Sequence, residues 1–156
     1  MGRPKLLLPW GDGMLIDQVL SAWMASRVDQ VVVILRKDDL ELAEACRRSG
    51  AQIVLPIRDP LDMKESVQCG LRVIAESYGP LEHDRCFVAP ADLPTLTPQI
   101  IDRLITMRSD ASTIVAPRFG QKLGHPALLP WPITKEIFEL GPDEGVDRVV
   151  KRHKQK

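Results

Sequence analysis

The sequence predicts an α/β fold in which an open, mostly parallel sheet carries helices on both faces. Strand and helix signals alternate along the chain almost without interruption, as is typical of strands joined by crossover helices. The strand signals are continuous apolar runs rich in β-branched residues, such as QVVVILR at 30–36, which indicates strands buried on both faces. With 156 residues and no internal repeat or linker, the chain is expected to form a single domain over residues 1–156.

Three helices and two strands are expected in the first half of the chain. Apolar residues at intervals of three and four mark the helices. Asp38 and Asp39 can cap the second helix, while Gly50 and Gly79 can end the second and the third. In order, the expected elements are a helix over about 14–26, a strand at 30–36, a helix that stops at Gly50, a strand at 51–56 and a helix over about 63–78.

In the second half of the chain, the sequence predicts the same alternation of strands and helices. Thr97 can cap a helix that has Pro98 at its first position and an apolar face toward the core. Ligands of such sheets bind beyond the carboxyl ends of the strands, so the loops after the strands are expected to carry function. In order, the expected elements are a strand at 85–90, a loop at 91–96, the helix from Pro98, a strand at 112–117, a turn and short strand within 120–130, and two weaker helices over about 133–140 and 144–153.

Charge balance, the length of apolar runs and the cysteine count limit the classes of protein to which this chain can belong. Lysine plus arginine equals aspartate plus glutamate at 21 each, so no net field would attract nucleic acid or a membrane surface. The apolar run in MGRPKLLLPW is too short for a signal peptide or a membrane span. Three widely spaced cysteines form neither a disulfide framework nor a metal clip, which predicts a reducing, cytoplasmic location.

The segment PADLPTL holds the first candidate for chemistry, Asp92. This carboxylate follows a buried apolar strand and lies between Pro90 and Pro94, which restrict the backbone on either side. A carboxylate at the carboxyl edge of a parallel sheet can bind Mg²⁺, which takes few protein ligands together with phosphate oxygens and water. From spacing alone, a plain turn-capping role for Asp92 is equally open.

The opening MGRPK supplies two cations, Arg3 and Lys5, on either side of a proline. Arginine can grip phosphate oxygens in a bidentate fashion, and lysine acts as a point charge. A disordered basic terminus is the alternative, but three leucines and a tryptophan follow at once, and disordered arms seldom carry so much apolar bulk.

Weaker candidates lie further along the chain. Ser66 falls in the first turn of the third helix, where a hydroxyl and backbone N–H groups can meet a base or a phosphate. His125 lies between Gly124 and a proline, and Asp143 lies near the start of the last helix; a structural role is open for both. The sequence has no nucleophile elbow, no G-x-x-x-x-G-K loop and no H-E-x-x-H motif.

Five segments together resemble the MobA-like nucleotidyltransferases. MGRPKLLLPWGDG, MKESVQCGL, PADLPTLTPQIIDRL, GQKLGHPALLP and PDEGVDRVV stand in the order found in that family, and the likeness spans nearly the whole chain. The PKLLLPWG opening and the GHP tripeptide are more similar to the molybdenum cofactor cytidylyltransferase branch than to the guanylyltransferase branch.

The resemblance implies a Rossmann-like three-layer α/β/α fold of the nucleotide-diphospho-sugar transferase type. It implies an enzyme that transfers CMP from CTP to a molybdopterin-type acceptor with release of pyrophosphate, and a molybdenum hydroxylase as a further partner. Lys5 would hold the triphosphate and Asp92 the catalytic Mg²⁺. The remaining roles that it implies are substrate binding by Arg3 and Gly124, a place near the base for Ser66 and near the acceptor for His125, and a second metal contact by Asp143.

Two departures from the family pattern shape further expectations. Family members begin with a central strand and an LAAGxSxR loop directly before the MGRPK segment, so we expect this chain to lack the first strand and to be less stable for it. Pro142 precedes Asp143, and Asp147 stands where the family commonly has arginine. Guanylyl transfer to another phosphorylated acceptor, and a catalytically silent relative that binds or delivers the cofactor, remain open as alternatives.

Overall fold

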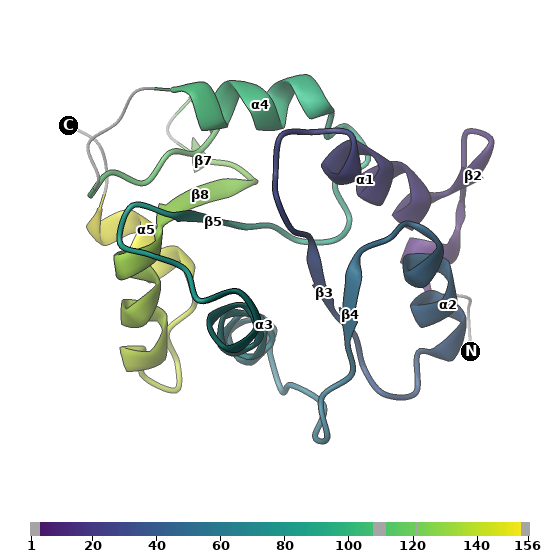
Figure 1. The fold of residues 1–156 in the computed structure, drawn as a ribbon, viewed down its shortest axis with the longest axis horizontal. Coiled ribbons are helices and arrows are strands. Elements are labelled where there is room, and N and C mark those ends of the chain that lie inside the picture. Colours follow the sequence, from purple (N-terminus) through teal and green to yellow (C-terminus); the bar gives the residue numbers. More distant parts are fainter. Residues whose placement is uncertain (1–3, 108–111, 121, 154–156) are drawn as a thin grey trace. The chain divides into compact units, whose positions relative to one another are not determined.

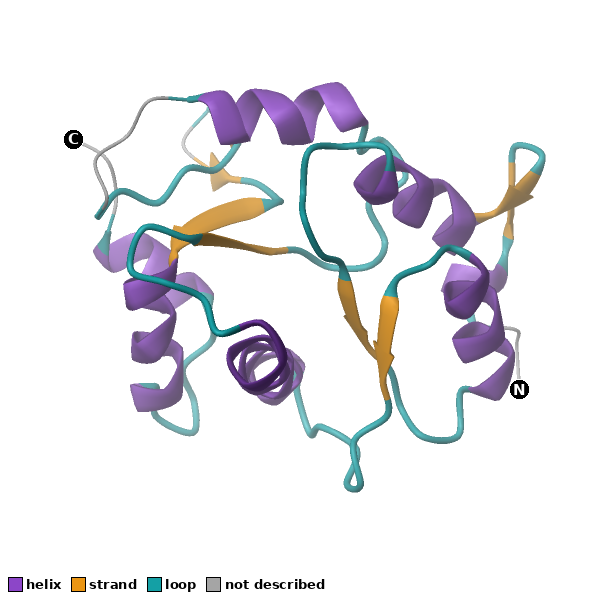
Figure 2. Ribbon diagram, in the orientation of Figure 1, coloured by secondary structure: helices purple, strands orange, loops and turns teal. Residues whose placement is uncertain are grey.

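A computed structural model describes residues 4–107, 112–120 and 122–153 (Figure 1). Helices and strands alternate along most of the chain (Figure 2). They form two compact units, each made from two separate stretches of sequence. Unit 1 comprises Met1–Asp59 and Pro90–Ile105, and unit 2 comprises Pro60–Ala89 and Thr106–Lys156.

Unit 1 is built around a short parallel strand pair with two helices beside it. Val33 pairs with Ile53 at the centre of this pair, as expected for strands joined by a crossover helix. Each strand is only half-buried, and the helices supply most of the buried apolar side chains. The elements of unit 1 are η1 (Lys5–Leu7), β1 (Pro9–Trp10), β2 (Gly13–Met14), α1 (Leu15–Met24), β3 (Val32–Ile34), α2 (Leu40–Arg48), β4 (Gln52–Val54) and nearly all of α4 (Pro98–Thr106).

The core of unit 1 begins at the N-terminal segment. Leu7, at the end of η1, is 1% exposed and joins the apolar faces of α1 and α2 in one cluster. Ala91 packs against the same cluster, so the second stretch of unit 1 is tied to the N-terminal segment. The buried members are Leu7, Ile16, Leu20, Leu35, Leu42, Ala43, Ala45, Cys46 and Ala51.

Unit 2 is centred on an antiparallel pair in which one strand is fully buried. Cys86 of β5 (Arg85–Val88) pairs with Leu129 of β8 (Ala127–Pro130), and every residue of β8 is buried. Val115 forms an isolated antiparallel bridge to Leu128 on the same strand. The elements of unit 2 are α3 (Met63–Tyr78), β5 (Arg85–Val88), β6 (Arg118–Phe119), β7 (Lys122–Leu123), β8 (Ala127–Pro130), η2 (Trp131–Glu139) and α5 (Asp147–Arg152).

Local signals set both ends of α3. Asp62 is its N-cap, and the side chain accepts a hydrogen bond from the Glu65 N–H at 2.8 Å. The Glu65 carboxylate accepts in turn from the Leu61 N–H at 2.9 Å. Gly79 ends the helix in the left-handed region, with φ of 55°, where glycine carries no steric penalty.

Several expectations for the C-terminal half are corrected by the structure. The expected strand at 112–117 is, in its described residues, a single bridge at Val115 rather than a regular strand. The expected helix over about 133–140 is the 3₁₀ helix η2, and the one over about 144–153 is limited to α5. Among the described strands only β3 and β4 pair in parallel, because β8 follows a hairpin and returns antiparallel to β5. An apolar run indicates burial, but it does not encode the direction of the partner strand.

Among the described residues, none of the helices has the length and apolar character needed to cross a membrane.

Candidate active site

Asp92 lies in the loop of unit 1 that leads to α4, four residues beyond the end of β5. The segment is held by Ala91, which packs on the core, and by Leu96, which is buried and donates its N–H to the Leu93 carbonyl at 3.0 Å. The Thr97 hydroxyl accepts from the Ile100 N–H at 3.3 Å and so begins α4, as the sequence predicts. The loop is therefore held by the core on one side of Asp92 and by this turn and α4 on the other.

Lys5 meets this carboxylate. Its Nζ donates to Oδ2 of Asp92 at 2.6 Å, across 87 residues of sequence. Lys5 is the first residue of η1, and the buried Leu7 two residues later anchors that turn to the core. The structure thus brings together the two residues that the sequence singles out most clearly.

The Lys5–Asp92 pair is accessible to ligands. The side chains are 68% and 40% exposed, so the pair contributes only about 0–1 kcal/mol to stability. An accessible ammonium binds phosphate oxygens, and an accessible carboxylate binds a divalent cation. The pair combines the two charges that a metal–triphosphate complex needs.

The side chains available as metal ligands fit a metal ion that binds together with its substrate. Within the described part of the chain, no group of three or more histidine, cysteine, aspartate or glutamate side chains could hold a metal ion. Asp92 would therefore supply a protein ligand, with phosphate oxygens and water making up most of the shell. This is the coordination that Mg²⁺ prefers in phosphoryl-transfer sites.

Two of the cysteines are unsuited to nucleophilic chemistry. Burial, with the charge of Asp17 adding to it, raises the pKa of Cys46 to about 11. Burial alone raises the pKa of Cys86 to about 12. Both thiols are protonated at neutral pH, so neither offers the thiolate that covalent catalysis requires.

Residues 1–156 match the family described as the MobA-like NTP transferase domain. The chain belongs to this family. Its α/β, Rossmann-like fold is confirmed by solved structures that superpose on nearly the whole chain.

The individual proteins to which this chain is similar are distant in sequence. The molybdenum cofactor cytidylyltransferase of Escherichia coli (strain K12) is 24% identical over 139 residues, which cover 89% of this chain and 68% of that protein. Rv0371c of Mycobacterium tuberculosis H37Rv superposes with a TM-score of 0.77 at 24% identity, over 98% of this chain and 77% of its own. The structure of 4-diphosphocytidyl-2C-methyl-D-erythritol synthase gives a TM-score of 0.73 at 15% identity, over 96% and 79%.

The other predicted site residues of this MobA-like chain belong to unit 2, except Arg3, which lies outside the described residues. The Ser66 hydroxyl donates to the Asp62 carbonyl at 3.1 Å, within the first turn of α3. The Gly124 N–H donates to the Pro117 carbonyl at 2.7 Å, and the exposed His125 follows it. Asp143 is exposed in the turn before α5. Their roles remain predictions.

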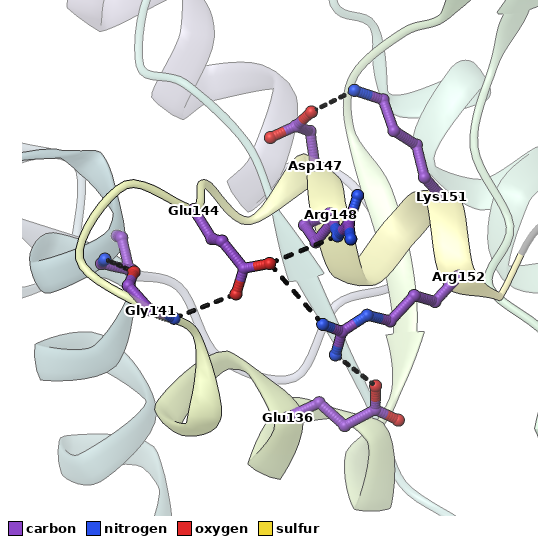
Figure 3. A network of polar contacts seen from close by, with 8 residues as sticks. Glu136, Gly141, Glu144, Asp147, Arg148, Lys151 and Arg152 are labelled. Carbon is purple, nitrogen blue, oxygen red and sulfur yellow. Dashed lines mark hydrogen bonds and ion pairs between the residues drawn. The ribbon is translucent and has the colours of Figure 1, made fainter.

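A polar network around that turn was not foreseen from the sequence (Figure 3). The buried Lys64 donates through Nζ to the carbonyls of Gly141 at 2.6 Å and Pro142 at 3.2 Å. Lys64 stands three residues before Val67 on the apolar face of α3. A lysine in line with the apolar face of a helix is the sequence signal that could have identified Lys64 as a buried residue.

Glu144 closes the same turn from the other side. Its Oε2 accepts from the Gly141 N–H at 3.0 Å, and its Oε1 lies 3.3 Å from Nε of Arg148 and 3.8 Å from Nη2 of Arg152. Arg152 also lies 3.9 Å from Glu136. Figure 3 shows the side chains of Arg148 and Arg152 both directed at the Glu144 carboxylate.

Glu144→Gln should lower the melting temperature at pH 7 but not in acid. The Gly141 hydrogen bond, helped by Arg152 and Arg148, holds the pKa of Glu144 below its ordinary value of 4.5. A lowered carboxyl pKa stabilises the folded state above that ordinary value, and the gain is lost as pH falls through the folded-state pKa. Melting curves of both proteins from pH 7 to pH 3 measure the difference. Glu139→Gln, at an exposed position of η2, is the control and should show no pH-dependent gap.

Proposed function

We propose that this chain is a divalent-metal-dependent nucleotidyltransferase that transfers CMP from CTP to the phosphate of a molybdopterin-type acceptor. The observation that carries the proposal is the 2.6 Å contact between Lys5 and Asp92, at the position where the MobA-like pattern predicts triphosphate and metal binding. The E. coli relative, a molybdenum cofactor cytidylyltransferase, supports the choice of nucleotide and acceptor. Residues 1–156 would act as one domain in this reaction, in the cytoplasm.

The reaction needs no protein nucleophile. An oxygen of the acceptor phosphate attacks the α-phosphorus of the nucleotide, the bond from that phosphorus to the oxygen bridging to the β-phosphate breaks, and pyrophosphate leaves. Lys5 would bind the triphosphate, and its charge would stabilise the leaving group. Asp92 would hold the metal, which supplies charge neutralisation on the phosphate oxygens.

The metal is expected to be Mg²⁺. A structure of Rv0371c in complex with manganese, with a TM-score of 0.68 to this chain, supports a divalent cation in this fold. Asp143 would contribute a second metal contact. Arg3 would bind phosphate, Ser66 would lie near the base, and Gly124 and His125 would meet the acceptor.

Two other functions differ from this one in measurable ways. Guanylyl transfer to another phosphorylated acceptor would show a preference for GTP. A catalytically silent relative that delivers the cofactor to a molybdenum hydroxylase would bind the cofactor and leave CTP intact. The Lys5–Asp92 pair favours catalysis, because a carrier has no need of a metal and triphosphate site.

Calorimetric titration of the 156-residue chain with CTP and GTP, each with and without Mg²⁺ or Mn²⁺, tests the proposal. Binding of CTP that requires the metal and exceeds binding of GTP is the expected result. A chromatographic assay with the molybdopterin acceptor then follows pyrophosphate release.

Lys5→Met should weaken CTP binding about tenfold or more, since it removes a charge-assisted contact to phosphate. CTP binding that does not require the metal would contradict the proposal, and so would a Lys5→Met variant that binds CTP as tightly as the wild type.

A further inference from the structure

The contact between Lys5 and Asp92 occupies a carboxylate oxygen that a metal ion could use. Nζ of Lys5 lies 2.6 Å from Oδ2 of Asp92, which makes this a short, charge-assisted hydrogen bond. An ammonium and a divalent cation on one carboxylate repel each other, because both carry positive charge. While the contact is made, Lys5 therefore competes with a metal ion for Asp92.

The backbone of Lys5 is fixed, but its ammonium is able to move. The Lys5 carbonyl accepts a hydrogen bond from the Leu8 N–H at 3.2 Å, and Leu7, which is 1% exposed, anchors the same turn in the core. The Lys5 side chain, in contrast, is 68% exposed, and its ammonium is carried by a flexible four-carbon stem. Lys5 can therefore exchange Asp92 for a phosphate without a movement of η1.

The apolar cluster that anchors Leu7 also supports the backbone beside Asp92. Ala91 packs against this cluster, and both Lys5 and Asp92 belong to unit 1. The Asp92 side chain is 40% exposed, so the ion pair faces water and is weakened by salt. A ligand that offers each partner an opposite charge can therefore separate the pair at little cost.

Neither half of a metal–nucleotide complex suits the pair by itself. The pair is neutral as a whole, because it joins one ammonium to one carboxylate. A metal ion alone meets an oxygen that is already bonded to an ammonium, and a triphosphate alone brings negative charge beside the Asp92 carboxylate. The metal–triphosphate complex gives the ammonium an anion and the carboxylate a cation at the same time.

We propose that Lys5 shields Asp92 from free metal ions and exchanges it for the triphosphate when the metal–nucleotide complex binds, an inference that rests on the proposed function. Each member of the pair then has an opposite charge as its partner both before and after the exchange. The ion pair makes metal binding depend on the nucleotide, so a metal ion without nucleotide binds weakly.

Binding of Mn²⁺ to the full chain without nucleotide tests the shield, with the free ion measured by electron paramagnetic resonance. Lys5→Met should raise the affinity for Mn²⁺ about fivefold or more, since it removes both the competing bond and the like charge. The same variant is expected to bind CTP less tightly. Opposite changes in the two affinities distinguish a shield from general damage, which would weaken the binding of both ligands.

Lys37→Met is the matched control. Lys37 is another exposed lysine of unit 1, in the loop after β3, where its backbone N–H donates to Oδ1 of Asp59 at 3.0 Å. The variant makes the same change in net charge but leaves the bond between Lys5 and Asp92 intact. It should therefore alter the affinity for Mn²⁺ by less than about twofold.

A second measurement follows the Lys5 ammonium directly by nuclear magnetic resonance of an isotope-labelled chain. The Nζ signal of Lys5 is identified by its loss in Lys5→Met. This signal should shift in Asp92→Asn, which removes the charged partner, and it should also shift in the wild type when CTP and Mg²⁺ are added.

Three results would overturn the inference. An affinity for Mn²⁺ that is unchanged or lower in Lys5→Met would show that Lys5 does not shield the carboxylate. A gain that persists when Lys5→Met is combined with Asp92→Asn would show that the metal binds elsewhere. An Nζ signal that is the same in Asp92→Asn would show that the two residues do not pair in solution.

The failure of the proposed function has a different signature. CTP binding by the wild type can still require a metal under each of those three results, so they remove the shielding role of Lys5 alone. A wild-type chain that binds no CTP with any metal would overturn the proposed function itself, and the exchange of partners with it.

Discussion

Asp92→Asn should reduce nucleotidyl transfer by about a thousandfold while leaving the fold intact. The change keeps the shape of the side chain but removes the negative charge that would hold the metal against the triphosphate. The fold should tolerate it, because the pair with Lys5 is exposed and worth at most about 1 kcal/mol. Initial rates at saturating CTP and Mg²⁺, together with a melting curve, measure both effects.

Asp102→Asn is the matched control for that variant. Asp102 also lies in unit 1, and its Oδ1 accepts from the Arg27 N–H at 2.8 Å, which makes it a structural carboxylate. This variant should lose some stability and keep its transfer rate. A fully active Asp92→Asn enzyme would remove Asp92 from the catalytic machinery, whereas equal loss in both variants would point to general damage of unit 1.

Leu129→Ala should cost unit 2 about 2–5 kcal/mol of unfolding free energy. Leu129 is 0% exposed on β8, opposite Cys86, and belongs to the cluster formed with Leu71, Ile133 and Ile137. Truncation removes its transfer free energy and leaves a cavity, because packed neighbours relax only in part. Urea unfolding followed by circular dichroism gives the difference at 25 °C.

A surface leucine provides the comparison for Leu129→Ala. Leu81 is 59% exposed, and Leu81→Ala should change the free energy of unfolding by less than about 0.5 kcal/mol. If Leu129→Ala cost under about 1 kcal/mol, β8 would not be the packed centre of unit 2. The two variants share one chemical change, so burial alone distinguishes them.

The sequence was most informative where structure depends on local signals. The helix predicted over about 63–78 is Met63–Tyr78 in the structure, because an N-cap aspartate and a C-terminal glycine act within a few residues. The predicted strand at 112–117 failed because a strand needs a partner, and Val115 meets β8 at a single bridge. The apolar pattern there reports burial, since Ile114 and Val115 are indeed in the core.

The same difference between local signals and long-range contacts applies to the residues of the candidate site. Lys5 and Asp92 could be selected by residue type and by neighbouring prolines, yet their contact spans 87 residues and no local pattern encodes it. Lys64 was missed altogether, because a lysine on a helix is usually exposed and only the distant Gly141 and Pro142 carbonyls give it a role. Long-range pairs of this kind follow from topology.

The discontinuous make-up of unit 1 has a consequence for biosynthesis. Lys5 is translated well before its partner Asp92, which follows with the rest of the Pro90–Ile105 stretch only after α3 and β5 have been made. Domains generally fold from the N-terminus during synthesis, so the nascent unit 1 must wait with part of its core uncovered while residues of unit 2 leave the ribosome. No single cut in the chain can release either unit whole. A ribosome that stalls before residue 90 would therefore present an incomplete unit to the chaperones and proteases of the cell.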